Sequence, residues 1–349
     1  MNEVIRTPGL HAQIALLLSA IALSLGGTRL YARYALRCGI TARINFRSLH
    51  KEVVPRGGGI VFATMFSATS IVAWVCGVST PQLTLLVGIG GAASAFFGFL
   101  DDVVELRALT KIVAHTCLGF WGLAIISRTP QFAVVTELGA LAFIPISFAL
   151  VFVFVWFINL YNFIDGIDGM AASGSVFISS AAMLILLVTG ADPVLVFILG
   201  LLAACSLSFL FFNLPPARIF MGDAGSIFLG YTIISLLLYT VILGQMSIWT
   251  WLAILSYYIG DTTVTGAYRV IHVDKWYGAH RSHAYQNLAR IYDSHALVTY
   301  GVNLYNVLWA LPMAFWTVFV PEHAPVAVTL ALAPVVLWTL RFGPRLSSS

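Results

Sequence analysis

Charged residues are scarce in this 349-residue chain, and their scarcity excludes an ordinary water-soluble globular protein. Asp, Glu, Lys and Arg make up 9% of the residues, whereas 60% are hydrophobic and the mean hydropathy is +0.93. A typical soluble domain carries about 25% charged residues. The chain also lacks strand-like alternation, Pro/Ser-rich linkers and any internal repeat, which argues against a β-barrel and against several domains. We therefore predict one integral membrane domain over residues 1–349.

Cysteine is equally scarce. The chain has four cysteines and no Cys-x-x-Cys pair, and Cys76, Cys117 and Cys205 fall inside apolar runs. This spacing supports neither a disulfide framework nor a cysteine zinc site.

Long apolar runs dominate what remains, and a run of about 20 apolar residues can cross a bilayer as a helix. We therefore predict an all-α polytopic fold with about 11 transmembrane helices. The first run follows Arg6 and precedes a basic segment instead of a small-residue cleavage site, so we expect a retained helix. The predicted spans are 10–28, 57–77, 82–100, 109–127, 139–160, 170–189, 193–212, 224–243, 247–266, 297–320 and 324–341.

The basic residues predict the orientation of these helices, because Lys and Arg in short loops mark the cytoplasmic side. Segment 29–56 holds seven basic residues, which places the N-terminus in the periplasm and, with eleven spans, the C-terminus in the cytoplasm. All Lys and Arg residues except Arg6 and Arg128 then face the cytoplasm. The same assignment gathers the predicted active-site loops on that side, near 29–56, 101–108, 161–169, 213–223 and 267–296.

The few carboxylates form three clusters at the ends of apolar runs, namely 101–105, 159–169 and 220–226. Acids retained beside a bilayer commonly mark an ion, phosphate or proton site. Amides and carboxylates grouped in this way suit a hard cation or the polar edges of a nucleoside. Asp223 stands between glycines just before an apolar run, where a helix N-terminus favours an anion. Solvated turns and ordinary helix capping are the competing interpretations for all three clusters.

Two basic segments could serve phosphate contacts or simply topology. Loop 267–296 carries His280, Arg281 and His283, and with no third His or Cys nearby we favour phosphate contacts over a zinc site. The arginines of segment 29–56 are equally well explained as a topology signal beside anionic lipids.

Together these motifs resemble the polyprenyl-phosphate N-acetylhexosamine-1-phosphate transferases, also called glycosyltransferase family 4. The resemblance covers the chain from about 45 to 290. Within the family, this chain is similar in form to the bacterial enzymes that initiate O-antigen repeats. Four separated motifs carry it in order: Lys51 to Gly59, Asp101-Asp102 with Lys111, Asn159 to Ala171, and Asn213 to Gly230.

The resemblance implies transfer of a sugar 1-phosphate from a UDP-N-acetylhexosamine to undecaprenyl phosphate, with release of UMP at the cytoplasmic face of the bacterial inner membrane. The implied donor sugar is N-acetylglucosamine or a 6-deoxy relative such as N-acetylfucosamine. The implied cofactor is Mg²⁺, with Mn²⁺ as a substitute. Membrane lipids are further partners, a homodimer is compatible with the family, and no nucleic acid is expected.

The resemblance also implies roles for individual residues. Asp101 and Asp102 match paired aspartates near the acceptor, and they are the expected catalytic residues. Asp223 and Asn162 match the metal site. The positions expected to bind the nucleotide sugar, with Phe220 stacking on uracil, are Lys51, Lys111, Asn159, Asp165, Asp168, Asn213, Phe220, His280, Arg281 and His283.

Other interpretations stay open at this point. A cation- or proton-coupled carrier would also retain membrane carboxylates, but carriers usually bind near the bilayer midplane between repeated halves. A CDP-alcohol phosphotransferase would need a downstream arginine and paired aspartates that 165–169 lacks. Direct attack by the lipid phosphate and a two-step route through a phospho-aspartate are both compatible with the motifs.

Overall fold

The computed structural model describes residues 9–41, 53–137, 139–272 and 282–344. Helices account for nearly all of this part of the chain, and it contains no β-strand beyond an isolated bridge between Thr41 and Pro55. The α-helices are α1 (Leu10–Arg37), α2 (Gly59–Val75), α3 (Pro81–Leu83), α4 (Gly90–Val104), α5 (Ala108–Ile126), α6 (Ala133–Glu137), α7 (Ala140–Ile164), α8 (Met170–Thr189), α9 (Pro193–Asn213), α10 (Gly222–Ile242), α11 (Ile248–Ile254), α12 (Ser256–His272), α13 (Ala284–Ile291), α14 (His295–Tyr305), α15 (Leu311–Phe319) and α16 (Ala324–Phe342).

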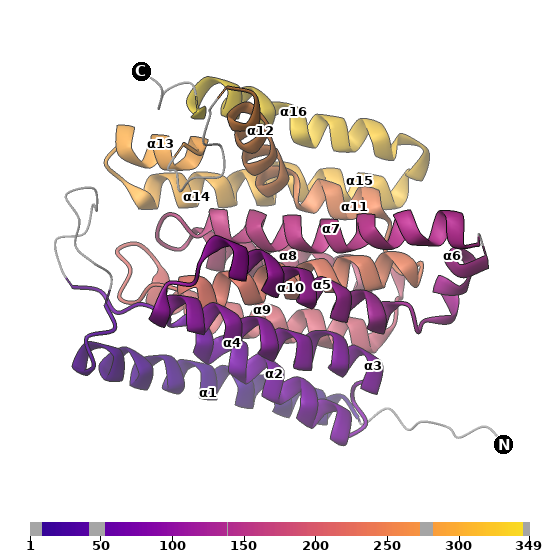
Figure 1. Cartoon of the computed structure of the whole chain (residues 1–349), viewed down its shortest axis with the longest axis horizontal. Helices are drawn as coiled ribbons and strands as arrows, with labels where there is room; N and C mark the ends of the chain where they lie inside the picture. Colours follow the sequence, from indigo (N-terminus) through magenta and orange to yellow (C-terminus); the bar gives the residue numbers. More distant parts are fainter. Residues whose placement is uncertain (1–8, 42–52, 138, 273–281, 345–349) are drawn as a thin grey trace.

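Irregular helical turns connect some of these elements into longer rods. A π-helical stretch at Thr84–Ile89 joins α3 to α4, and another at Asn306–Ala310 joins α14 to α15. Short 3₁₀ turns at Pro130–Phe132 and Pro321–His323 precede α6 and α16. Most of the long helices lie roughly side by side in one bundle, with α1 along one side and α16 along the other (Figure 1).

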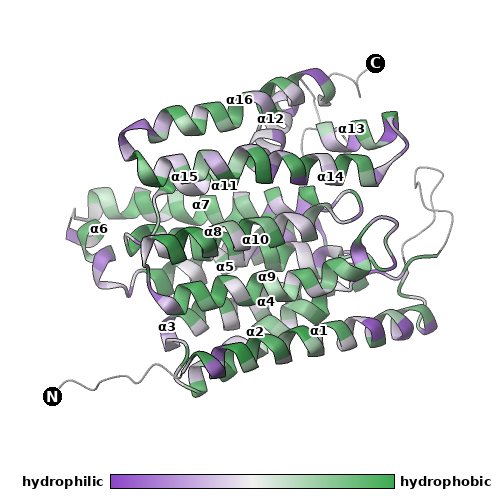
Figure 2. Ribbon diagram, turned by 180° about the vertical axis from the view of Figure 1, so that it is seen from behind, coloured by the Kyte–Doolittle hydropathy of each residue, from purple (hydrophilic) through white to green (hydrophobic). Residues whose placement is uncertain are grey.

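The prediction of an all-helical membrane protein is confirmed, and the helix count is partly supported. Within the described residues, nine helices are long and apolar enough to cross a membrane. The other two predicted spans correspond to α2, which has 17 residues, and to the pair α11 and α12, whose helices meet at Leu255. Apolar residues colour most of the helical ribbon (Figure 2), as expected for a bundle surrounded by lipid.

Helix α10 is the central helix of the bundle, with 89% of its most apolar window buried. It packs against α2, α4 and α7. The contact with α4 is close enough to require glycine, because a Cβ atom on Gly98 would lie 2.2 Å from the carbonyl oxygen of Asp223. The first turn of α10 is therefore held against α4, which carries Asp101 and Asp102.

Candidate functional site

Asp223 lies at the centre of a polar cluster in the first turn of α10. The side-chain amide of Asn162, in α7, donates to Asp223 Oδ1 at 3.1 Å and to Ser226 Oγ at 2.9 Å. Arg56 Nη2 lies 3.6 Å from Asp223 Oδ1, and Lys111 Nζ lies 3.6 Å from Asp223 Oδ2. The side chain of Asp223 keeps 21% of its surface exposed, so a ligand can reach it.

Asp102 caps the N-terminus of α10 from a different helix. Its Oδ1 accepts the backbone N–H of Asp223, and its Oδ2 accepts that of Ala224, both at 3.0 Å. Arg56 Nε forms an ion pair with Oδ1 at 3.0 Å, and the Asp102 side chain is only 1% exposed. Because the first N–H groups of a helix lack partners within the helix, a buried carboxylate stabilises this end. Asp102 thereby fixes the backbone that carries Asp223.

Asp101 completes the cluster on the side of α5. Its Oδ1 accepts the backbone N–H of Leu106 at 2.8 Å, and its Oδ2 pairs with the ammonium group of Lys111. The Asp101 side chain is nearly fully buried. Lys111 thus contacts Asp101 and Asp223, just as Arg56 contacts Asp102 and Asp223.

Backbone pairing brings Arg56 into this cluster. Phe220 donates its N–H to the carbonyl of Pro55, while Gly58 and Gly59 donate to the carbonyls of Phe220 and Met221. These bonds hold the segment before α2 against the segment before α10. Phe220 is half-buried in this arrangement.

A second group of polar residues holds the 161–169 and 213–223 loops together. Asp168 accepts the backbone N–H of Ala217 at 3.0 Å and pairs with His295 Nδ1 at 3.2 Å. Asn213 accepts the N–H of Gly169 at 3.0 Å and donates to the carbonyl of Ile219 at 2.9 Å. Both side chains are buried, and these hydrogen bonds join the two loops.

Asp165 lies in the first of these two loops, directly after α7 ends at Ile164, and its charge state responds to the cluster. Desolvation raises the pKa of Asp165 to about 7, and the negative charges of Asp223 and Asp102 add to this rise, whereas Arg56 opposes it. Near neutral pH this carboxyl group is therefore divided between its two forms.

Two further predicted residues, Asn159 and His283, contact other neighbours, and three lie outside the described part of the chain. Asn159 donates to the carbonyl of Val155 at 2.7 Å and lies 3.2 Å from His115 Nδ1. His283 is buried against Asp261 and packs its ring 5.9 Å from that of Phe163. Lys51, His280 and Arg281 lie outside the described residues.

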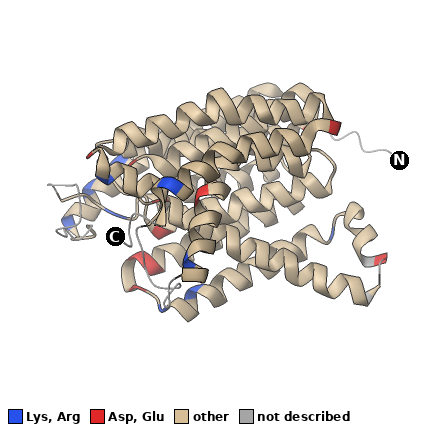
Figure 3. Cartoon of the chain, turned by 90° about the horizontal axis from the view of Figure 1, so that it is seen from above, with Lys and Arg blue, Asp and Glu red and all other residues tan. Residues whose placement is uncertain are grey.

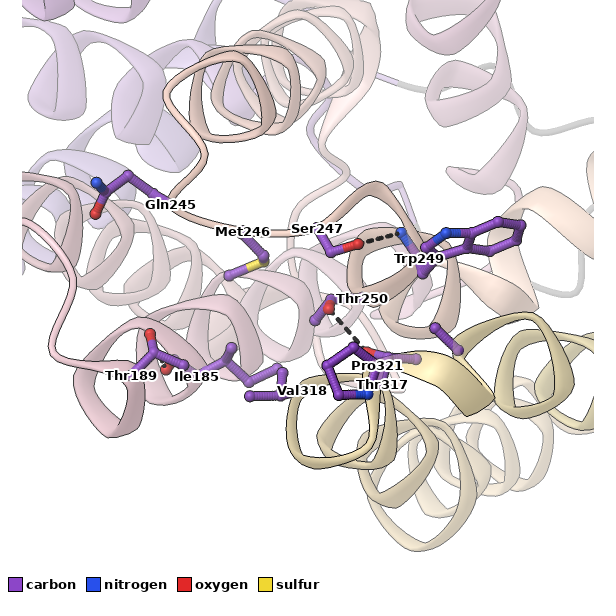
Figure 4. Close-up of a pocket in the computed structure, with 11 residues that line it drawn as sticks. Ile185, Thr189, Gln245, Met246, Ser247, Trp249, Thr250, Thr317, Val318 and Pro321 are labelled. Atoms are coloured by element: carbon purple, nitrogen blue, oxygen red, sulfur yellow. Dashed lines mark hydrogen bonds between the residues drawn. The ribbon is translucent and has the colours of Figure 1, made fainter.

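Most charged residues lie toward one end of the bundle, with a few at the opposite end (Figure 3). The three acidic segments meet at the charge-rich end. A cavity of about 200 Å³ lies at the other end, where α8 ends, α10 connects to α11, and α15 connects to α16 (Figure 4). Uncharged residues such as Thr189, Gln245 and Trp249 line it, and it contains none of the predicted site residues.

The chemistry of the cluster fits magnesium shared with a bound phosphate. No three His, Cys, Asp or Glu side chains in the described ranges are grouped to hold a metal by themselves. Mg²⁺, however, commonly uses one or two carboxylates together with substrate phosphates and water. The oxygens of Asp223, with the amide oxygen of Asn162 after rotation of the amide, supply hard ligands of this kind. Arg56 and Lys111 beside them suit phosphate oxygens.

Sequence reasoning missed four residues in or near this network: Arg56, His115, Ser226 and Asp261. Arg56 stands within one of the motifs, but the arginines of its segment are equally well explained as a topology signal. Ser226 follows Asp223 by three residues, which is the spacing of neighbours on one helical face. His115 and Asp261 are polar residues inside predicted apolar spans, and that position was the available signal.

Comparisons with known proteins agree with this arrangement. Residues 84–241 match the model of glycosyl transferase family 4, a stretch that includes all three acidic clusters. A relative from Bacillus subtilis (strain 168), named "Probable undecaprenyl-phosphate N-acetylglucosaminyl 1-phosphate transferase", is 27% identical over 288 residues, which is 81% of this chain and 79% of the relative.

Two further relatives carry the name phospho-N-acetylmuramoyl-pentapeptide-transferase. The protein from Desulforamulus reducens is 28% identical over 60% of this chain and 68% of its own length. The protein from a Wolbachia of Drosophila simulans is 34% identical over 52% of this chain and 58% of its own length. The chain thus resembles enzymes that are named for different sugars.

Proposed function

Since the chain belongs to glycosyl transferase family 4, we propose that it transfers a sugar 1-phosphate from a UDP-N-acetylhexosamine to undecaprenyl phosphate and releases UMP. The names of the relatives support a hexosamine-1-phosphate transferase that acts on a polyprenyl phosphate. The donor we favour is UDP-N-acetylglucosamine or a 6-deoxy relative, and the product would start a lipid-linked envelope glycan such as an O-antigen.

The observation that carries this proposal is the cluster around Asp223. Three carboxylates from α4 and α10 alternate with Arg56 and Lys111 at the charge-rich end of the bundle. A nucleotide diphosphate with a divalent cation matches this mixture of hard oxygen ligands and cations. The charge-rich end would face the cytoplasm, where a UDP-sugar is available.

Direct transfer is the simpler mechanism for this geometry. An oxygen of the lipid phosphate would attack the sugar-linked phosphorus, and the bond from this phosphorus to the UMP oxygen would break. A bound Mg²⁺ would neutralise the developing charge. Asp102 is poorly suited to act as a nucleophile, because both of its oxygens already accept backbone N–H groups and one also pairs with Arg56. Asp102 then acts by positioning Asp223, and Asp101 by holding Lys111.

The test is UMP release by the purified full-length protein in lipid nanodiscs. The assay contains Mg²⁺, undecaprenyl phosphate and one UDP-N-acetylhexosamine at a time, and we expect UMP only when donor, acceptor and metal are all present. Labelled donor without acceptor should leave no label on the protein, whereas a phosphorylated enzyme would establish the two-step route. Passage of a UDP-sugar or ion across a vesicle membrane without UMP release would favour the carrier.

Asp223→Ala should abolish UMP release while the protein still inserts and elutes normally. Asp192→Ala is the matched control, because Asp192 is also a helix-terminal aspartate but lies at the start of α9, where it caps Val194 N–H at 2.9 Å. The control should cost about 1 kcal/mol of stability and leave turnover near wild type. Equal turnover in the two variants would show that Asp223 takes no part in the reaction.

A further inference from the structure

Asp261 is a buried carboxylate that belongs to none of the three acidic clusters. It lies in α12 and is 2% exposed. A carboxylate so deep in an apolar bundle costs free energy unless hydrogen-bond donors surround it. Its partners therefore indicate why it is there.

Two donors and one histidine ring nitrogen, from two other segments, meet at Asp261. Its Oδ1 accepts the backbone N–H of Ala284 at 3.0 Å and the hydroxyl of Thr339 at 3.2 Å. Its Oδ2 lies 3.1 Å from His283 Nδ1. Asp261 thus joins α12 to α16 and to the start of α13, which lies within the 267–296 segment.

The side chain of His283 lies next to the segment that carries Asp165. The His283 ring is 5.9 Å from the ring of Phe163 and 5.7 Å from that of Tyr285. The Tyr285 hydroxyl in turn donates to the carbonyl of Phe163. The start of α13 is therefore fixed against the end of α7, two residues before Asp165.

The contact with Asp261 determines what His283 can present to a ligand. A carboxylate that already accepts N–H and O–H groups at Oδ1 accepts a proton-bearing Nδ1 at Oδ2, and the bond at one ring nitrogen sets the state of the other. Nε2 lies on the opposite edge of the imidazole and is directed away from Asp261. When both nitrogens carry protons, Nε2 can donate to a phosphate oxygen while Asp261 pairs with the positive charge.

We propose that Asp261 is a positioning residue that holds His283 by accepting its Nδ1 proton, so that Nε2, when it is protonated as well, donates to the diphosphate of the donor. This inference rests on the proposed transferase function. Asp261 itself would touch neither substrate nor metal. Its effect would pass through His283 alone.

Asp261→Asn is the decisive variant, because it keeps the shape of the side chain but reverses one hydrogen bond. The amide oxygen can still accept from Ala284 and Thr339, whereas the amide N–H₂ faces His283 and forces Nδ1 to become an acceptor. The ring then stays neutral, and its contact with the diphosphate loses the positive charge that Asp261 supports. We expect KM for the UDP-sugar to rise by about tenfold or more, with a much smaller change in kcat. Thr339→Val is the control, because it removes a hydrogen bond to Asp261 without changing the bond to His283, and KM should stay within about twofold of wild type.

A double-mutant cycle separates positioning from general packing. If Asp261 acts through His283, adding Asp261→Asn to His283→Gln should raise KM no further than His283→Gln alone. Independent, multiplicative effects of the two substitutions would overturn the proposal. An Asp261→Asn protein with the same KM as Thr339→Val would overturn it as well.

A spectroscopic measurement tests the contact without an activity assay. A variant that is inactive because it folds poorly therefore cannot be mistaken for support. In ¹⁵N-histidine spectra of the full-length protein, the signal that disappears in His283→Gln should report a proton on Nδ1, and Asp261→Asn should move this proton to Nε2. A wild-type signal with a bare Nδ1 would refute the inference. If the spectra agree but no UDP-sugar yields UMP, the proposed function fails while the contact between Asp261 and His283 stands.

Discussion

Replacing Gly222 by alanine should disable the site by displacing Asp102. Gly222 has a φ angle of +73°, and a Cβ atom there would lie 2.5 and 2.8 Å from the two carboxylate oxygens of Asp102. Asp102 would have to move away from the start of α10. The N–H groups of Asp223 and Ala224 would then lose the acceptor that now fixes this turn.

The expected loss of stability can be compared with that at a matched glycine just past the other end of the same helix. Gly244 has a φ angle of +67°, and a Cβ atom added there would meet no heavy atom within 4 Å. Alanine at either position costs about 1–2 kcal/mol for the left-handed backbone. Gly222→Ala should cost about 1.5–3 kcal/mol more, because at least one hydrogen bond to a buried carboxylate is lost. A loss of that size in positioning Asp223 corresponds to about a tenfold to hundredfold fall in kcat.

The assay compares thermal unfolding in detergent and UMP release for the two variants. Gly244→Ala should lower the melting temperature slightly and leave kcat near wild type. Gly222→Ala should lower both by more. If the two variants unfold alike and both retain full turnover, Asp102 does not position Asp223 for the reaction.

Four further outcomes follow from the same network. Because a cation at Asp223 would offset the charge that helps to raise the pKa of Asp165 to about 7, ionisation of Asp165 should raise the apparent Mg²⁺ affinity up to about tenfold from pH 6 to pH 8. Calorimetry of Asp165→Asn should show a correspondingly smaller rise. The folded protein keeps the Asp165 proton up to about pH 7 while the unfolded chain releases it near 3.8, so this group favours folding at low pH and loses that effect as pH rises to 7. Lys111→Gln leaves buried Asp101 without its cation and should lower both the melting temperature and donor affinity, whereas unchanged donor binding would exclude Lys111 from phosphate contact. Asp168→Asn weakens the bond to Ala217 and should cost about 1–3 kcal/mol in unfolding experiments, with normal stability contradicting its role between the loops.

The helical fold was predictable because apolar runs of membrane length leave few alternatives for the backbone. Interruptions were harder to see. Residues 247–266 read as one span, yet α11 ends at Ile254 and α12 begins at Ser256 and continues to His272. The second helix is less apolar, with one aspartate and three threonines in 261–265, but these polar residues begin six residues after Leu255, so hydropathy does not locate the break.

The meeting of the acidic segments was predictable from charge asymmetry, but the partners of each acid were not. The sequence places Asp101 and Asp102 on different faces of α4, because neighbours on a helix are rotated by about 100°. It does not reveal that Asp102 turns toward the first N–H groups of α10. That contact depends on the close packing of Gly98 against Asp223, which is a property of the assembled bundle.

The charge balance of the cluster is a physical argument for the proposed divalent cation. Asp101, Asp102 and Asp223 outnumber Arg56 and Lys111 within a set of direct contacts. A carboxylate without its own counter-charge beside an apolar bundle is costly. Asp223 lies near both cations, but Arg56 also pairs with Asp102 and Lys111 also pairs with Asp101. Stability alone would favour removing this acid or adding a base. Its retention is understandable if a bound divalent cation supplies the missing charge when a diphosphate arrives, and this is the reason to test Asp223 before any other residue of the site.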